Sequence, residues 1–330
     1  MANSSNKRTI LIDWPRGAQG PTLRIGGMTL IERHIREAAG SGASVVVRAP
    51  TQHVSHLRVD GVDFLVIDIT DDAPTHDERI EADHLLGIRV TDSASSRRAE
   101  AALMQTCRRP YDGPADRVLI RPVSLQISRL LTRLPIRPNH VTALTAVLGL
   151  VACALVTMPT TVNLVAAGAL MLVAVVLDSV DGELARVRHM GSQSGMWLDN
   201  VSDDILDNVF VACLGFGLGD HWLWIGLAAA AGRSICALVI YAGAAKLGKP
   251  GDVMAFRWWF ESGSDTEAVF GNPWSPLTML RSLGRRDVYV LVWAGSLLAL
   301  QPFIAFALGV INSAVYFVLA VLHRALSEKS

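Results

Sequence analysis

Residues 178–203 read D-S-V-D-G-E-L-A-R-V-R-H-M-G-S-Q-S-G-M-W-L-D-N-V-S-D, and they join two long apolar segments. Half of the 14 acidic residues that follow position 140 fall between 178 and 207. These seven are Asp178, Asp181, Glu183, Asp199, Asp203, Asp204 and Asp207. Acidic side chains at membrane depth are energetically costly and usually functional. The stretch therefore predicts a site of chemistry where two membrane helices meet.

The spacing of the aspartates indicates the kind of site. Asp178 and Asp181 are separated by three positions, and Asp199 and Asp203 by four, so each pair lies on one face of a helix. Four carboxylates converging from two antiparallel helices repel one another unless cations lie between them. Such an all-oxygen site suits Mg²⁺, Mn²⁺ or Ca²⁺ rather than zinc, and two divalent ions balance four carboxylates. Paired ions can clamp the attacking and leaving oxygens of a phosphoryl displacement. The alternative is a set of solvated carboxylates in a cytoplasmic loop.

Apolar segments on both sides of this stretch indicate a membrane protein. Of the 330 residues, 51% are hydrophobic and 18% charged, and the mean hydropathy is +0.34. A membrane helix needs about 17–25 mostly apolar residues. Six segments qualify or nearly do: 140–158, 162–180, 197–218, 222–244, the shorter 286–301, and 303–323. We expect an all-α polytopic membrane domain of six transmembrane helices, preceded by a small α/β cytoplasmic domain.

Basic residues predict the orientation of these helices. The connections between spans one and two, three and four, and five and six contain no Lys or Arg. Apart from Arg233 within the fourth span, these residues lie in the other connections, at the start of the fifth span or in the two termini. Because cytoplasmic loops are enriched in Lys and Arg, both termini should be cytoplasmic, in the inner membrane if the source is bacterial. The totals of 30 basic and 30 acidic residues cancel, which argues against a strongly basic nucleic-acid binder.

The region before residue 110 has the pattern of a small parallel sheet. Thr9–Ile12, Ala43–Ala49 and Val62–Ile69 are strand-like, and Leu30–Ala39 and Ser93–Cys107 are helical in pattern. The acidic stretch from Thr70 to Asp83 is predicted to be irregular. We divide the chain into an α/β domain (1–110), an amphipathic juxtamembrane helix (111–137) and the membrane domain (138–325).

Two further segments are candidates for the membrane surface. Arg117–Leu134 alternates Arg with apolar residues and should be helical from about Pro122. It either lies on an anionic membrane surface or packs against the soluble domain. Residues 250–285 contain Phe256, Trp258, Trp259, Phe260 and Trp274. They predict either an interfacial helix that partly covers the site or an ordinary loop.

The opening stretch resembles the signature of the CDP-alcohol phosphotransferases, D-x2-D-G-x2-A-R-x8-G-x3-D-x3-D. All eight fixed positions are present without a gap, and the resemblance covers about residues 110–325. It implies transfer of a substituted phosphate group from a CDP-alcohol to an acceptor alcohol, with release of CMP, in phospholipid or related biosynthesis. The donor would be CDP-diacylglycerol or a CDP-linked polar head group. A homodimer and membrane lipid are the implied partners, and no nucleic acid is expected.

The resemblance also implies a role for each signature residue. Asp178, Asp181, Asp199 and Asp203 would bind two Mg²⁺ or Mn²⁺ ions, and Asp203 would be the general base. Gly182, Ala185, Arg186 and Gly195 would hold the CDP moiety. Residues 137–142 resemble the P-N-x-x-T start of the first span in the family. Asn139 and Thr142 are thus nucleotide contacts, or else Pro138 and Asn139 simply start a helix.

Three arginines are candidates for a donor or acceptor phosphate. Arg233 lies in the middle of the fourth span, where it needs an anionic partner. That partner is a substrate or, alternatively, Asp204 or Asp207. Arg285 and Arg286 precede the fifth span, and they either bind phosphate or only mark the cytoplasmic side of the helix.

The N-terminal region resembles part of the sugar-phosphate nucleotidyltransferases, through Gly26-Gly27-Met28-Thr29-Leu30-Ile31 and the following Val45-Val46-Val47. A fused cytidylyltransferase that makes CDP-inositol is known beside this type of membrane domain. Here the Gly-rich phosphate loop is absent and Met28 replaces the usual Lys. We expect a degenerate domain with a structural or regulatory role, the alternative being retained nucleotidyl transfer.

A cation-coupled transporter is the rival class of protein. It would also place carboxylates in the membrane, but it gives no reason for Gly182, Ala185, Arg186 and Gly195 at their spacings. Inverted repeats would favour it, and the sequence has no evident ones.

Overall fold

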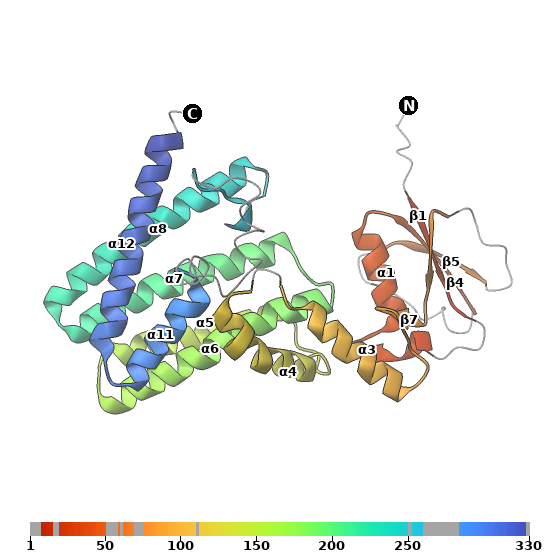
Figure 1. The fold of residues 1–330 in the computed structure, drawn as a ribbon, viewed down its shortest axis with the longest axis horizontal. Coiled ribbons are helices and arrows are strands. Elements are labelled where there is room, and N and C mark those ends of the chain that lie inside the picture. Colours follow the sequence, from red (N-terminus) through yellow and green to blue (C-terminus); the bar gives the residue numbers. More distant parts are fainter. Residues whose placement is uncertain are drawn as a thin grey trace. The chain divides into compact units, whose positions relative to one another are not determined.

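The computed structural model describes residues 8–15, 20–50, 59, 62–68, 76–109, 112–249, 253–259 and 284–327. The chain packs as two compact units (Figure 1). The first comprises Met1–Arg108 with two short segments, Arg129–Pro135 and Leu184–Met190. The second comprises Arg109–Ser128, Ile136–Glu183 and Gly191–Ser330. The last residues of two helices therefore pack with the first unit.

The first unit contains a four-stranded parallel sheet. Its strands are β1 (Thr9–Asp13), β4 (Ser44–Ala49), β5 (Phe64–Asp68) and β6 (Glu78–Glu81), in the order β5-β4-β1-β6. β1 and β4 are apolar and almost wholly buried, as expected for central parallel strands. The predicted parallel sheet is confirmed. The prediction that 70–83 is irregular is wrong for 78–81, which form the edge strand β6.

Helices and hairpins complete this unit. The helices are α1 (Leu30–Gly40) and α3 (Ser93–Thr106), with a short η1 (Gly20–Thr22). The hairpins are β2 (Arg24–Ile25) with β3 (Met28–Thr29) and β7 (His84–Leu85) with β8 (Ile88–Arg89). α1 begins where the Thr29 side chain accepts a hydrogen bond from the Glu32 N–H. Its Ile31 and Ile35 are fully buried in the sheet core.

The second unit is helical. It contains η2 (Asp116–Ile120), α4 (Arg121–Leu131), α5 (Pro138–Val156), α6 (Thr161–Val187), α7 (Gln193–Leu218), α8 (Asp220–Lys246), η3 (Val253–Ala255), α11 (Arg286–Leu298) and α12 (Pro302–Ser327). Each of the six predicted apolar segments coincides with one helix of this set: α5, α6, α7, α8, α11 and α12. Pro138 is the first residue of α5, where its missing N–H costs nothing.

Four of these helices are long and apolar enough to cross a membrane: α5, α6, α8 and α12. α7 has sufficient length but contains Asp199, Asp203, Asp204 and Asp207. α11 has 13 residues, fewer than the roughly 17 that a span requires. By length and composition, the described residues therefore supply four spans.

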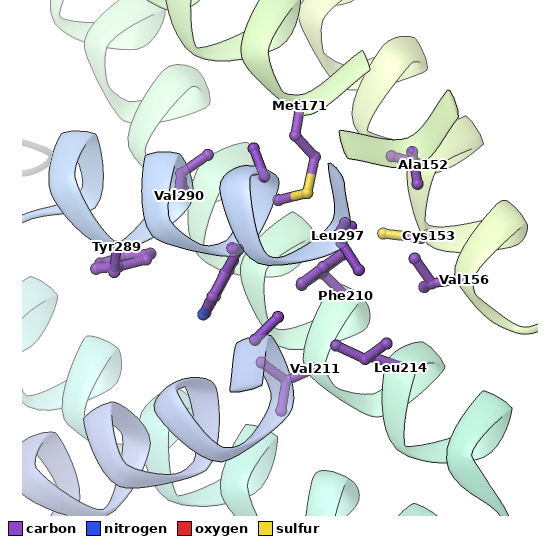
Figure 2. Packing of buried hydrophobic residues seen from close by; sticks show 14 of the residues in the cluster. Ala152, Cys153, Val156, Met171, Phe210, Val211, Leu214, Tyr289, Val290 and Leu297 are labelled. Atoms are coloured by element: carbon purple, nitrogen blue, oxygen red, sulfur yellow. The ribbon is translucent and has the colours of Figure 1, made fainter. Parts of the chain in front are cut away.

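The core of the second unit holds α5, α6, α7, α11 and α12 together (Figure 2). The rings of Phe210 and Trp293 stack with their centroids 5.0 Å apart. α5 and α7 approach closely at Gly217, where a Cβ atom would lie 2.1 Å from the Val156 carbonyl oxygen. Only glycine permits this approach. The packing fixes α7 against α5, and with it the carboxylates at the other end of α7.

The predicted interfacial helix falls mostly outside the described residues, as do Phe260 and Trp274. Phe256, Trp258 and Trp259 are described and follow η3. Their rings surround His323 of α12, at centroid distances of 4.9, 5.7 and 6.2 Å. These three aromatic residues thus pack against α12.

Candidate active site

The carboxylates of the signature meet between α6 and α7. Carboxylate oxygens of Asp178, Asp199 and Asp203 lie within 4.8 Å of one another. Asp178 comes from α6, and the other two lie one turn apart on α7. Oxygen-only ligands at this separation fit a hard divalent cation such as Mg²⁺ or Mn²⁺. The predicted convergence of these three residues is what the structure shows.

Asp181 is the fourth aspartate, and its side chain has a partner on another helix. It is almost fully buried, and Thr142 on α5 donates a hydrogen bond of 2.6 Å to it. Outer hydrogen bonds of this kind orient metal-binding carboxylates. The structure thus places Thr142 beside a signature aspartate. We predicted Thr142 as a nucleotide contact and did not predict this hydrogen bond.

Gly195 and Asn139 lie together at the start of α7 and α5. Ser192 caps α7 by accepting a hydrogen bond of 3.0 Å from the Gly195 N–H. A Cβ atom on Gly195 would lie 2.9 Å from the Ser192 hydroxyl and 3.9 Å from Oδ1 of Asn139. Glycine at this position therefore keeps the space between the two helix starts open. Gly182 is half-buried on α6, directly after Asp181.

Arg286 brings a positive charge to the carboxylates. Its Nη1 lies 3.1 Å from Asp178 and 2.8 Å from Asp203, and its Nε lies 3.6 Å from Asp207. Arg286 is the first residue of α11, so the start of this helix reaches the cluster. Of the three candidate arginines, it is the one in contact with signature aspartates.

Arg233 contacts other carboxylates. It is buried on α8, with Nη2 2.9 Å from Asp207 and 3.9 Å from Asp204. Tyr289 on α11 also bonds both Arg233 and Asp207. The structure thus realises the alternative in which Arg233 pairs with Asp204 or Asp207. Sequence reasoning did not single out Tyr289, although it shares a helix face with Arg286 three positions earlier.

Arg285 points to a different group of residues. It bonds Asp116 at 3.1 Å and Asp287 at 3.0 Å. Burial, together with the charge of Asp287, raises the pKa of Asp116 to about 6 even though Arg285 opposes the shift. The Arg285 guanidinium therefore bridges η2 and the start of α11.

Glu183 anchors α4, and sequence analysis counted it only as a member of the acidic cluster. It is fully buried and accepts hydrogen bonds from Arg121 at 2.6 Å, Ser124 at 2.7 Å and Ser128 at 2.6 Å. Arg121 also bonds Asp112 at 2.8 and 2.9 Å. α4 is thereby fixed to α6 two residues beyond Asp181.

α4 turns its polar face inward. We expected the segment Arg117–Leu134 either to lie on an anionic membrane surface or to pack against the soluble domain. In the structure, Arg121 of α4 is buried in the Glu183 network, and Arg117 of η2 donates to the Asp112 carbonyl. The apolar residues Val118 and Leu119 of η2 and Val123 of α4 are about half exposed, at 55%, 58% and 48%. Farther along, Arg129 and Arg133 pair with Glu100, as the alternative of packing against the soluble domain requires. Contact of this segment with a membrane surface stays a prediction.

Ala185 and Arg186 belong to the first unit. Arg186 lies near the Cys107 carbonyl, with Nη2 3.5 Å from its oxygen. In the same unit, Arg33 donates to the Val187 carbonyl at 2.7 Å. The turn that follows α6 contains His189 with a positive φ of 48°.

Comparison with known proteins supports the signature. A family model for CDP-alcohol phosphatidyltransferase matches residues 135–318. A bifunctional IPC transferase and DIPP synthase of Thermococcus kodakarensis is 33% identical over 129 residues, which are 39% of this chain and 29% of that protein. A protein of the same name from Aquifex aeolicus is 33% identical over 111 residues, 34% of this chain and 25% of its own length. The matched regions thus span under a third of these relatives. The family model covers more than half of the chain, and the chain belongs to the CDP-alcohol phosphatidyltransferase family.

Proposed function

We propose that this chain is an integral-membrane, divalent-metal-dependent enzyme that transfers a substituted phosphate group from a CDP-alcohol to an acceptor alcohol and releases CMP. The observation that carries the proposal is the approach of Asp178, Asp199 and Asp203 to within 4.8 Å in a chain of this family. The rival transporter rests on acidic residues alone, whereas the family and its intact signature favour phosphate transfer.

The four aspartates are proposed to hold two Mg²⁺ or Mn²⁺ ions. Asp178, Asp199 and Asp203 offer oxygen atoms at a suitable separation, and Thr142 orients the Asp181 carboxylate. When bound, the ions would supply positive charge against the diphosphate oxygens.

Asp203 is proposed as the general base. It would take the proton of the acceptor hydroxyl, whose oxygen then forms a bond to the phosphorus farther from cytidine. The bond between that phosphorus and the bridging oxygen breaks, and CMP leaves with the electron pair. A base must lie within hydrogen-bond reach of the proton that it removes, and Asp203 lies at the carboxylate cluster.

The remaining signature residues are proposed to hold the CDP moiety: Gly182, Ala185, Arg186, Gly195, Asn139 and Thr142. Of Arg233, Arg285 and Arg286, we assign the phosphate contact to Arg286. Its guanidinium already lies among the signature carboxylates, so cations bound by these carboxylates would release it toward a phosphate oxygen.

The same proposal places six helices in the membrane: the four apolar spans α5, α6, α8 and α12, and in addition α7 and α11. Both termini would be cytoplasmic, because the connections on the opposite side contain no Lys or Arg. The active unit is proposed to be a homodimer.

A CMP-release assay on the purified full-length chain tests the proposal. The panel begins with the substrates of an IPC transferase and a DIPP synthase, and continues with CDP-diacylglycerol and polar alcohols. Each pair is assayed with Mg²⁺, with Mn²⁺ and with a chelator. We expect metal-dependent CMP release from one donor and acceptor pair. Absence of CMP from every pair, with metal present, would exclude the proposed transfer for these substrates and count against an enzyme.

A further inference from the structure

The first unit contains a cavity that the proposed transfer does not use. Its volume is about 780 Å³, within the range of roughly 300–1,000 Å³ typical of small-molecule sites. All of the residues that line it belong to this unit. They come from the β2–β3 hairpin, α1, α3, the end of α4 and the turn after α6.

The charged lining is strongly basic. It contains five arginines, Arg24, Arg36, Arg97, Arg133 and Arg188, against Glu32 and Glu100. Both carboxylates are engaged within the unit. Glu32 pairs with Arg36 at 3.1 Å, and Glu100 pairs with Arg129 at 2.9 Å. The positive charge of the cavity thus exceeds what its own carboxylates neutralise.

Two of the arginines are available to an incoming anion. Among the described residues, Arg24 and Arg97 have no carboxylate partner, and both side chains are exposed. Arg24 donates only to the Gly27 carbonyl, at 3.0 Å. The planar guanidinium group of arginine can bind two phosphate oxygens through two parallel hydrogen bonds.

Arg188 is held rigidly in the wall. It donates to the carbonyls of Leu131, Thr132 and Leu134 at 3.1, 2.9 and 2.6 Å. Burial lowers the pKa of Arg188, and the charge of Arg24 lowers it further. The two guanidinium groups therefore repel each other, and an anion bound beside them would remove that repulsion.

The uncharged lining contains an apolar wall. Leu23, Met28, Leu134, Pro135 and Met190 form it, beside Gly27 and the hydroxyl residues Ser93, Ser96 and Thr132. An inorganic anion makes no favourable contact with these apolar side chains, whereas the organic part of a phosphate ester can pack against them. The volume also accommodates more than a single phosphate group.

We propose that this cavity is a binding site for a phosphate ester, with the phosphate held by Arg24, Arg97 and Arg188 and the organic part against Met28 and Met190. The ester is either a soluble metabolite or the head group of an anionic lipid. Arg188 and Met190 lie in the chain between Asp181 and Asp199, so a bound ester would restrain the connection that joins the two metal-binding helices.

The test uses the full-length chain in phosphatidylcholine nanodiscs, with chelator present so that the proposed metal site does not contribute. Inorganic phosphate is titrated at constant ionic strength, and the thermal unfolding midpoint is recorded. We expect phosphate to raise the midpoint of the natural protein. The double variant Arg24→Gln/Arg97→Gln should weaken the apparent phosphate affinity by about tenfold or more.

Matched variants keep the result interpretable. Arg98→Gln removes the same charge from the next position of α3, outside the lining, and should bind phosphate like the natural protein. Arg24→Lys/Arg97→Lys retains the charge and should recover most of the affinity. If the double variant does not fold, Arg97→Gln alone changes one exposed helical side chain. Equal phosphate responses in the natural protein, the folded Gln variant and Arg98→Gln overturn the proposal.

A second set of nanodiscs distinguishes the two sources of ester. With phosphatidylglycerol included, a lipid head group would occupy the cavity, stabilise the natural protein more than the Gln variant, and abolish the response to phosphate. A soluble ester leaves the phosphate response unchanged in these discs. Either result supports the site. The proposal is refuted if phosphatidylglycerol and phosphate each raise the thermal midpoint of the Gln variant as much as that of the natural protein.

Discussion

Thr142 on α5 donates a 2.6 Å hydrogen bond to Asp181 on α6, across 39 residues of chain. Thr142→Val removes this donor while preserving the shape of the side chain. Loss of such an outer contact typically lowers metal affinity or activity by roughly 10–100-fold, and we expect the Mg²⁺ requirement for CMP release to rise in that range. Thr142→Ser should keep the contact.

Thr145→Val provides the control for this experiment. Thr145 is buried one turn along α5 and donates to the Val141 carbonyl of its own helix. It should retain the natural Mg²⁺ dependence. An unchanged Mg²⁺ dependence in Thr142→Val would show that Asp181 does not need this donor.

Asp203→Asn tests the proposed base. The amide keeps the size of the side chain but cannot take the proton from the acceptor hydroxyl, so CMP release should fall to the background while the protein remains folded and unfolds cooperatively on heating. Asp204→Asn is the neighbouring control, because Asp204 accepts a bond from Tyr241 instead. Full activity of Asp203→Asn would remove Asp203 from the mechanism.

Arg286→Gln should separate stability from metal binding. Without Arg286, Asp178 and Asp203 lose the cation that lies 3.1 and 2.8 Å away, so in chelator the thermal midpoint should fall. Added Mg²⁺ should then raise the midpoint at lower concentrations than in the natural protein, because no guanidinium competes for the carboxylates. Arg285→Gln should not show this tighter Mg²⁺ response, and identical Mg²⁺ titrations for both variants would contradict the expectation.

Glu183→Gln should destabilise the second unit strongly. Arg121 would lose one of the two carboxylates that it contacts in a buried site, and breaking a buried pair costs about 3–5 kcal/mol. The change is measured as a fall in the thermal midpoint. Asp220→Asn, an equivalent substitution at an exposed position at the start of α8, should have little effect; equal shifts would argue against the Glu183 anchor.

Asp116 predicts a pH dependence of stability. Its pKa is raised from 3.8 to about 6 in the folded chain, so its protonated form stabilises the fold. That contribution is complete below about pH 3.8 and is lost as the pH rises through 6. The thermal midpoint of the natural protein should therefore fall more between pH 5 and 7.5 than that of Asp116→Asn. Parallel pH profiles would exclude a raised pKa.

The sequence predicted those features that depend on neighbouring positions. The helices were predictable because apolar runs of suitable length are local, and the three converging aspartates because their spacing selects helix faces. β6 was missed because Glu78, Arg79 and Glu81 make it look like a loop. It is an edge strand, where charged residues are common because they discourage pairing with other chains.

Contacts between distant segments were not predictable. Nothing local to Arg286 indicates that it meets Asp178 and Asp203, since basic residues also flank membrane helices for orientation alone. Glu183 occupies a variable position of the signature, and its partners on α4 are 55 to 62 residues away. Such pairs depend on how helices pack, which a single sequence does not encode in its periodicity.

The inward polar face of α4 affects how this helix would attach to a bilayer. Electrostatic attachment to anionic lipid weakens as the salt concentration increases. Here the guanidinium of Arg121 is buried with Glu183 and Asp112, and the exposed apolar side chains are those of Val118 and Leu119 in η2 and of Val123 and Leu130 in α4. Contact with lipid through these apolar side chains would depend less on ionic strength than attachment through Arg121 would.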